Sequence, residues 1–261
     1  MFSTLLLDIT GNLATITLNR PEKRNAISTA MISELQSALD EIDRSTARVG
    51  ILTGNGKAFS AGMDLEMLAA IAQQSPVENE EDSRRMAKMF RRIWSFPKPL
   101  IAAVNGAAIA GGCGIATLCD FTLAVPEAKF GYTEVKIGFL PAIVSVFLMR
   151  QIGEKRTRDL LLTGRIFEAP EARDLGLINE IVALEELLDR ARELADVLIA
   201  ASPSSLTRTK RLLTSAAAAS LDADLERAVL ENARIRSTPD FKEGLASFLE
   251  KRKPVWRGDS E

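Results

Sequence analysis

The feature that most restricts the fold is a repeated alternation of short apolar runs with helical patterns. Residues 4–9 and 13–18 alternate around a Thr-Gly-Asn turn, which predicts a β-hairpin. Residues 29–44 carry apolar side chains at helical spacing behind Ser28, a residue type that favours the start of a helix. Three apolar runs that fit buried strands follow: Val49–Thr53, Leu100–Val104 and Phe121–Val125. This alternation predicts an α/β fold with a mainly parallel core.

The rest of the chain differs in character from this core. Residues 73–83 are polar and acidic and predict a mobile loop, followed by a helix whose basic residues (Arg84, Arg85, Lys88, Arg91 and Arg92) form a solvated face. From about residue 143 the pattern is almost wholly helical, with no strand beyond Ser202. We therefore expect a core at 1–200 and a helical region at 201–261, of the kind that commonly packs across a subunit boundary.

Composition excludes several classes of protein. The 261 residues include 33 basic and 35 acidic side chains, a balance that argues against nucleic-acid binding by bulk charge. The two cysteines, Cys113 and Cys119, lie in an apolar run without the close pairing of a zinc site, so we expect core packing and no metal. The N-terminal residues lack a signal-peptide pattern, and no 18-residue apolar stretch occurs. These features predict a cytoplasmic protein without a membrane span.

The chain contains no histidine. A Ser-His-Asp or Cys-His hydrolase, a histidine-ligated metal site and a histidine general base are therefore excluded together. Acid/base chemistry near neutral pH has to use carboxylates, Lys, Tyr, Cys or the backbone.

Three glycine-containing junctions follow apolar runs, at residues 56–65, 105–114 and 130–141. The second lacks the lysine of a phosphate loop and the spacing of a dinucleotide site, and its apolar continuation predicts a helix from about Gly111. Free N–H groups at such a helix start favour a developing oxyanion. A tight crossing of helix and sheet explains the glycines equally well, so both interpretations stay open.

The third junction contains a carboxylate among apolar neighbours. Glu134 lies between Tyr132, Val135 and Ile137, where desolvation would raise the pKa of its carboxyl toward the range useful for proton transfer. A surface salt bridge is the alternative interpretation.

Five segments, taken in order and with their spacing, form a joint pattern along essentially the whole chain. They are residues 19–26 (NRPEKRNA), 57–65 (KAFSAGMDL), 102–113 followed by Cys119-Asp120, 162–164 with 172–177, and 241–252. The pattern closely resembles that of the crotonase, or enoyl-CoA hydratase/isomerase, superfamily. The resemblance implies a crotonase-like spiral of ββα repeats with a C-terminal helical region, assembled as a homotrimer or homohexamer.

The resemblance also implies a substrate and a site. Family members bind an acyl-CoA so that its thioester carbonyl points at two backbone N–H groups, which by position belong here to Met63 and Gly111. Coenzyme A would be part of the substrate, with no separate cofactor. Its contacts would come from two segments of the core and, from a neighbouring subunit, from the C-terminal helix: Lys23, Arg24, Ala26, Ala61, Met63, Asp64, Leu65, Gly111, Phe248 and Lys251.

This sequence departs from the family at two points. The hydratases of the family use two glutamates; the second aligns with Glu134, whereas the first aligns with Gly114. A single base beside an oxyanion hole resembles the Δ3,Δ2-enoyl-CoA isomerases, with Tyr132 and Asp64 as candidate helpers or structural residues. After Pro141, residues 142–145 (AIVS) replace a glycine-rich run, which predicts a reshaped acyl pocket for a short, branched or unusual group.

These observations support an enzyme acting on an unsaturated acyl-CoA, with Glu134 as the single acid/base. Hydration and double-bond isomerisation both stay open. Two alternatives also stay open: a hydrolase or decarboxylase of the same fold, and an inactive CoA-binding or scaffolding protein, for which Gly114 is the motive.

Overall fold

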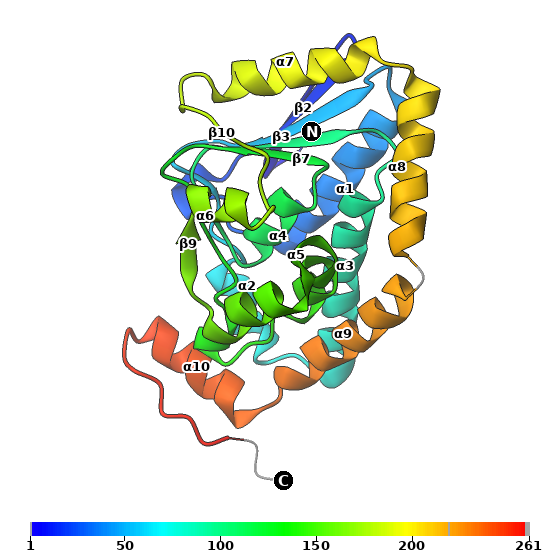
Figure 1. Cartoon of the computed structure of the whole chain (residues 1–261). Coiled ribbons are helices and arrows are strands. Elements are labelled where there is room, and N and C mark those ends of the chain that lie inside the picture. Colours follow the sequence, from blue (N-terminus) through cyan, green and yellow to red (C-terminus); the bar gives the residue numbers. More distant parts are fainter. Residues whose placement is uncertain (1, 219, 259–261) are drawn as a thin grey trace.

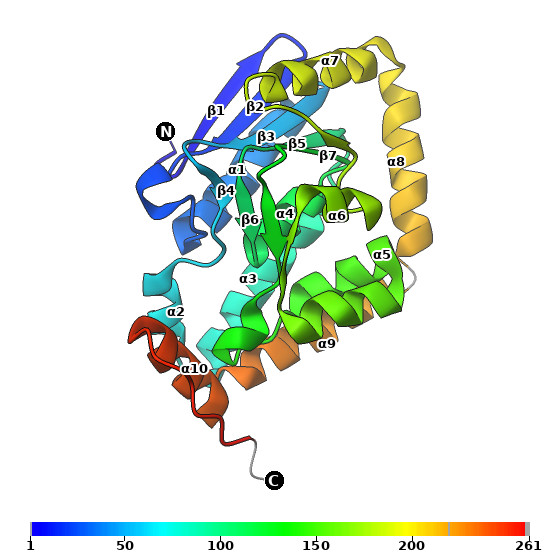
Figure 2. The same cartoon turned by 60° about the vertical axis from the view of Figure 1, so that its left-hand side comes forward.

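A computed structural model describes residues 2–218 and 220–258 of the chain. Its larger sheet has the order β1-β2-β3-β5-β7-β10 and lies at the top in Figures 1 and 2. The predicted hairpin is confirmed as β1 (Leu5–Thr10) and β2 (Leu13–Leu18), which pair antiparallel. The other strands are parallel: β3 (Val49–Gly54), β5 (Leu100–Val104), β7 (Phe121–Ala124) and β10 (Glu180–Ile181). The mainly parallel core is therefore confirmed.

A second, smaller sheet has the order β4-β6-β8-β9. Its strands are β4 (Ala58–Ser60), β6 (Ala107–Ile109), β8 (Lys129–Gly131) and β9 (Ile166–Glu168), of which the first three are parallel. The sequence patterns missed these strands, because three residues are too few to establish an alternation.

The two sheets are linked by a repeat. The chain passes from a strand of the larger sheet to a strand of the smaller sheet and then to a helix. The helices of three successive repeats are α2 (Leu65–Ile71), α4 (Gly111–Thr117) and the 3₁₀ helix η2 (Glu134–Ile137). This order confirms the expected ββα repeats, and α4 begins at the predicted residue.

Helix α1 (Thr29–Arg44) has the predicted bounds. The Ser28 side chain accepts a hydrogen bond from the Met31 N–H, which satisfies one free donor at the helix start. The buried side chains of Met31, Leu35 and Ile42 form its inner face. Here propensity, cap and apolar period agree, so local sequence suffices to define the element.

The loop predicted at residues 73–83 is wrong from residue 76, where α3 (Pro76–Trp94) begins. Ser75 and Glu78 form a reciprocal capping box, which stabilises the acidic first turns. The expected solvated basic face is also wrong in part, because three of its arginines pair with acidic residues of α1 and of α9 (Leu221–Ile235). The pairs are Arg84 with Glu226, Arg91 with Asp222, and Arg92 with Asp40 and Asp43.

The remaining helices are α5 (Ala142–Thr163, interrupted at Gly153), α6 (Ala169–Asp174), α7 (Leu187–Ala200), α8 (Pro203–Ala217) and α10 (Pro239–Leu249). The expectation of an almost wholly helical chain after residue 143 is wrong at β9 and β10. Beyond Ser202 the described residues form helices without strands, as expected. The boundary near residue 200 stays a prediction. No helix in the described ranges is long and apolar enough to cross a bilayer.

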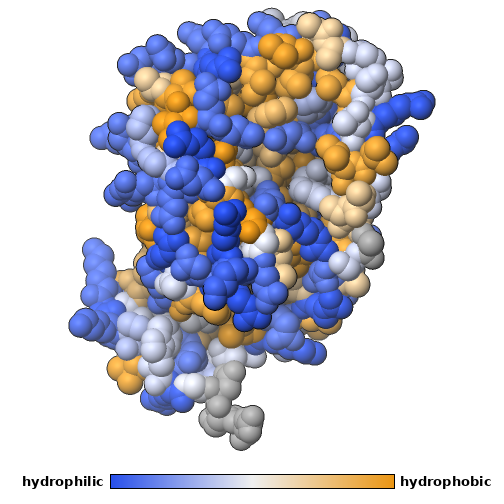
Figure 3. Space-filling model, viewed as in Figure 1, coloured by the Kyte–Doolittle hydropathy of each residue, from blue (hydrophilic) through white to orange (hydrophobic). Residues whose placement is uncertain are grey.

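Helix α8 extends along one side of the molecule, between α7 and α9 (Figure 1). None of its residues is buried, and Leu212 and Leu213 are exposed to 69% and 67%. Val197 on α7 is exposed to a similar degree. Figure 3 shows apolar side chains at the surface near the top and along the right-hand edge, where α7 and α8 lie.

Helix α10 fixes the position of η2. A Cβ atom at Gly244 of α10 would lie 2.3 Å from the backbone carbonyl of Ile137, and one at Gly138 would lie 2.3 Å from the Asp240 carbonyl oxygen. The two backbones are therefore in direct contact. Glu134 belongs to η2, so this packing sets the position of its side chain.

Gly244→Ala should lower the free energy of unfolding by about 1–3 kcal/mol, because the new methyl group has no space against Ile137. In an unconstrained helix the same change would stabilise the protein by about 1 kcal/mol. The sign of the change in unfolding free energy therefore shows whether the two backbones are in contact. Urea unfolding measures it. Lys242→Ala, at an exposed position of α10, is the matched control and should shift stability by no more than about 0.5 kcal/mol.

Candidate functional site

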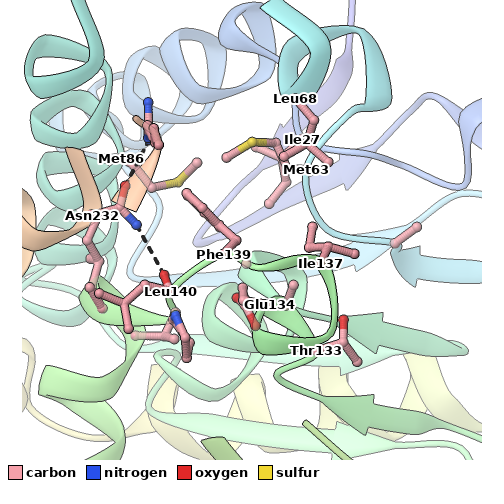
Figure 4. A pocket seen from close by; sticks show the side chains of 18 of the residues that line it. Ile27, Met63, Leu68, Met86, Thr133, Glu134, Ile137, Phe139, Leu140 and Asn232 are labelled. Atoms are coloured by element: carbon pink, nitrogen blue, oxygen red, sulfur yellow. Dashed lines mark hydrogen bonds between the residues drawn. The ribbon is translucent and has the colours of Figure 1, made fainter. Parts of the chain in front are cut away.

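A cavity of about 160 Å³ lies where the carboxyl ends of β4, β6 and β8 meet. Met63 follows β4, Gly111 follows β6 and Glu134 follows β8, and all three line this cavity. Neighbouring parallel strands end at the same edge of a sheet, which is why residues far apart in the chain converge here. Figure 4 shows Met63, Ile27 and Glu134 around the cavity. The cavity is close in size to one that holds a single benzene ring, roughly 150 Å³.

The backbone around Met63 leaves its N–H group free. Ile27 donates to the Gly62 carbonyl at 2.7 Å and accepts from the Asp64 N–H at 2.9 Å, so Met63 lies between two paired neighbours. Gly62 has a φ of 88°, and a Cβ atom there would lie 3.0 Å from the Ile109 carbonyl oxygen. Only glycine fits this backbone without strain.

Gly111 provides a second free N–H group, at the first turn of α4. Within residues 2–218 and 220–258, neither the Gly111 nor the Met63 N–H donates a hydrogen bond to the protein. Met63 and Gly111 both line the cavity, and both N–H groups are left without a protein acceptor among the described residues.

Ala110, immediately before Gly111, has an unfavourable backbone conformation, with φ 50° and ψ −123°. A non-glycine residue in such a region costs of order 1–3 kcal/mol. The Ala110 N–H donates to the Gly131 carbonyl at 2.7 Å, and its carbonyl accepts from the Gly114 N–H at 3.1 Å. These bonds hold Ala110 in place, and its ψ angle sets the direction of the Gly111 N–H.

Glu134 is buried, with 9% of its surface exposed. Its Oε2 atom has no hydrogen-bond partner among the described residues. Burial penalises the charged form and raises the pKa of the Glu134 carboxyl to about 7, against a smaller opposing effect of its own backbone N–H. The alternative of a surface salt bridge is therefore wrong. A carboxyl with this pKa exists in both protonation states near neutral pH and can accept or donate a proton.

Gly114 faces a space that apolar side chains already fill. A Cβ atom at Gly114 would lie 2.9 Å from Val144 Cγ1 and 3.2 Å from the Phe90 ring. No carboxylate could occupy this position without displacing Phe90 or Val144. Among the described residues that line the cavity, Glu134 is the only acidic one.

The two candidate helpers have structural partners. Tyr132 is buried outside the cavity lining, with its hydroxyl 3.4 Å from Thr117 Oγ1. Asp64 caps α2, accepting from the Glu66 N–H at 2.9 Å and pairing with Arg20 at 2.7 Å. Burial raises the pKa of Asp64, but these hydrogen bonds outweigh it and hold the pKa below its usual range. Asp64 therefore stays ionised and engaged near neutral pH.

The residues predicted to contact CoA fall into two groups. Ala61, Leu65 and Phe248 line the cavity together with Met63 and Gly111. Lys23, Arg24, Ala26, Asp64 and Lys251 lie outside its lining, although Lys23 pairs with Glu66 at 2.7 Å at the start of α2. Phe248 lines the cavity of its own chain, whereas we expected it to contact a neighbouring subunit.

Several lining residues carry no signal in the sequence. They come from α3, from the segment after η2, and from the end of α9: Met86, Phe90, Phe139, Leu140, Asn232 and Arg236. Helical periodicity marks the first two only as core, and Asn232 and Arg236 lie far along the chain from the motifs. Ala142, Ile143 and Val144 line the cavity, and the expectation that residues 142–145 reshape an acyl pocket stays a prediction.

Comparison with known proteins assigns the family. A sequence model described as enoyl-CoA hydratase/isomerase matches residues 8–259. This chain belongs to the enoyl-CoA hydratase/isomerase family. It is therefore an enzyme of that family, and its structural neighbours confirm the crotonase-like fold.

Individual relatives match over nearly their whole length. A Thermus thermophilus protein provisionally named as an enoyl-CoA hydratase is 46% identical over 94% of this chain and 97% of its own. The 2,3-dehydroadipyl-CoA hydratase of Escherichia coli is 32% identical over 98% of this chain and 99% of its own. The crystal structure of an enoyl-CoA hydratase/isomerase from Xanthobacter autotrophicus superposes with a TM-score of 0.89, at 30% identity, covering 97% and 98% of the two chains.

Replacing Glu134 by Gln should stabilise the protein at alkaline pH relative to acidic pH. The folded-state pKa of about 7 exceeds the ordinary 4.5, so the wild type loses stability as pH rises between these values. The difference in unfolding free energy between variant and wild type should grow by about 3 kcal/mol from about pH 4 to about pH 8. Urea unfolding at both pH values measures it.

Glu78→Gln is the control of opposite sign. Hydrogen bonds from the Ser75 backbone and side chain lower the pKa of Glu78, so the wild type gains stability from this group as pH rises. A pH-independent difference for Glu134→Gln would contradict a desolvated carboxyl.

Proposed function

We propose that this enzyme shifts the double bond of an enoyl-CoA, with Glu134 as its single acid/base. The observation that carries the proposal is the pairing of one desolvated carboxyl with a filled space at Gly114. Glu134, as carboxylate, accepts a proton from the α-carbon of a 3-enoyl-CoA, and the electron pair moves toward the thioester oxygen. The same carboxyl returns the proton to the γ-carbon, which gives the 2-enoyl-CoA.

The thioester enolate would accept hydrogen bonds from the Met63 and Gly111 N–H groups. Such donors stabilise developing charge best when they are already oriented, and each is worth roughly 3–4 kcal/mol. The strained Ala110 and the positive φ of Gly62 support this role, because both preset the directions of the donors. Ala61 and Leu65, which line the cavity, would contact the CoA portion together with Lys23, Arg24, Ala26, Asp64 and Lys251.

Hydration is the second candidate. The relatives of Thermus thermophilus and Escherichia coli both carry names of hydratases, which favours it. A hydratase of this geometry would have to position its water without a carboxylate at Gly114. Two further functions are compatible with the same site. One is thioester hydrolysis or decarboxylation, and the other is CoA binding without catalysis.

The assembly expected for this enzyme is a homotrimer or homohexamer. Support comes from the exposed apolar side chains of α7 and α8, including Val197, Leu212 and Leu213, which a second copy would cover. A cytoplasmic location and independence of metal ions and nucleic acids are also proposed, on composition alone.

Purified enzyme should convert 3-enoyl-CoA to 2-enoyl-CoA, and Glu134→Gln should lose this activity by at least about a hundredfold. Because Glu134 must be ionised to accept the first proton, kcat/KM should rise with pH and level off above about 7. Product analysis by chromatography separates the isomer from a hydrated product.

Rapid formation of 3-hydroxyacyl-CoA from 2-enoyl-CoA, at a rate exceeding isomerisation, would favour the hydratase instead. If acyl-CoA binds while wild type and Glu134→Gln both stay at background, the protein is a binding module.

The oxyanion donors can be tested through the backbone. Met63→Ala keeps the N–H and should change kcat less than about tenfold, whereas Gly62→Ala displaces it and should lower kcat about 10²–10³-fold. The displacement follows from the φ of 88° and the 3.0 Å approach to the Ile109 carbonyl. Steady-state kinetics measures both variants. Equal losses would contradict a backbone role.

A further inference from the structure

The cavity has a polar wall that the chemistry at Glu134 does not use. Arg236 follows α9, and only 1% of its side chain is exposed, yet it lines the cavity beside Asn232. Buried arginines are uncommon unless they are fully paired. Each hydrogen-bond donor of Arg236 is therefore expected to have an acceptor.

Four of its contacts are with the protein. Nη1 donates to Asp82 Oδ2 at 2.9 Å and to Asn79 Oδ1 at 3.3 Å, and Nη2 donates to Asn232 Oδ1 at 2.8 Å. The guanidinium also lies 5.5 Å from the centre of the Phe139 ring. Nε, which is buried, has no acceptor among the described residues. A buried donor without an acceptor needs an explanation, and a ligand in the cavity that Arg236 lines is one source of an acceptor.

The local charge favours an anionic acceptor. Asp82, itself buried, pairs with Arg236 and also with Arg85, an exposed side chain outside the cavity lining. Arg236 is the only cationic residue among the described residues that line the cavity, and Asp82 is not part of that lining. Neither Asn79 nor Asn232 adds charge. Burial lowers the pKa of Arg236, and the Asp82 charge opposes this effect. A desolvated positive charge at the cavity wall is stabilised by a carboxylate at short range.

The polar wall lies away from the proposed position of the thioester. In Figure 4, Asn232 lies on one side of the cavity and Met63 and Ile27 on the other, with Phe139 between them. Phe139 is apolar, and so are Met86, Phe90 and Val144, which also line the cavity. An acyl group that starts at Met63 would pass these side chains and end near Asn232 and Arg236.

We propose that Arg236 and Asn232 bind a carboxylate at the far end of the acyl group. The preferred substrate is then an acyl-CoA whose chain ends in a carboxylate rather than in a methyl group. This inference rests on the proposed function for the placement of the thioester. Arg236 acts in specificity, through its charge and its hydrogen-bond donors, and takes no part in proton transfer.

The test compares two acyl-CoA thioesters of equal chain length, one ending in a methyl group and one in a carboxylate. Saturated thioesters are titrated by calorimetry, and the enoyl pair is assayed for turnover. Because saturated chains cannot react, the binding comparison stays valid if the chemistry proposed for Glu134 fails. The wild type should bind the carboxylate-ended thioester at least about tenfold more tightly.

Arg236→Gln should abolish this preference, with the methyl-ended thioester affected much less. The matched control is Arg85→Gln, which removes the other guanidinium from Asp82 at a side chain that is 43% exposed and outside the cavity lining. It should keep the preference. Thermal unfolding of both variants confirms folding, and the wild-type preference alone tests the proposal if Arg236→Gln does not fold.

Equal affinity of the wild type for both thioesters, or a preference for the methyl end, overturns the proposal. Equal loss of the preference in Arg85→Gln and Arg236→Gln also overturns it, since charge outside the cavity would then suffice. Turnover of neither enoyl substrate, together with a retained binding preference, supports the carboxylate site and counts against the proposed function.

Discussion

The site depends on the parallel pairing of three very short strands, β4, β6 and β8. Each contributes only three residues, so the backbones have to approach closely for the sheet to form. A Cβ atom at Gly112 would lie 2.7 Å from the Ser60 carbonyl oxygen, and one at Gly106 would lie 2.3 Å from that of Lys57. The free N–H groups of Met63 and Gly111 follow directly after this contact. They are therefore consequences of backbone geometry and do not depend on the side chain of Met63.

The sequence predicted the parts of the fold whose local signals agree. Residues 29–44 combine a cap residue with an apolar period, and the structure has the helix with those bounds. The prediction of a loop at residues 76–83 was wrong because it followed their acidic composition and overlooked the Ser75–Glu78 capping box. The strands of the smaller sheet were not predicted, because three residues are too few to show an alternation. Arg236 and Phe90 could not have been placed in one cavity, because α3 and α9 are brought together by tertiary packing and by ion pairs such as that of Arg84 with Glu226.

Gly114 and the neighbours that fill its space form one unit. Phe90 and Val144 occupy the space that a side chain at Gly114 would need, and they line the same cavity as Glu134. A second carboxylate at Gly114 would add repulsion, whereas the apolar filling raises the pKa of Glu134 through desolvation alone. The sequence shows that a glutamate is missing at Gly114. The structure adds that Phe90 and Val144 occupy the space its side chain would need.

Two ionisable residues, Glu134 and Arg236, line the same apolar cavity, and burial affects them differently. Burial is the main cause of the raised pKa of Glu134, and no cation among the described residues is a cause that lowers it. A bare guanidinium close to Glu134 would have pulled this pKa down, so Arg236 has to be distant or neutralised. Asp82 neutralises it in part and Arg85 competes for the same carboxylate. A ligand carboxylate at Arg236 would complete the balance there, which leaves the proton affinity of Glu134 to be set by burial.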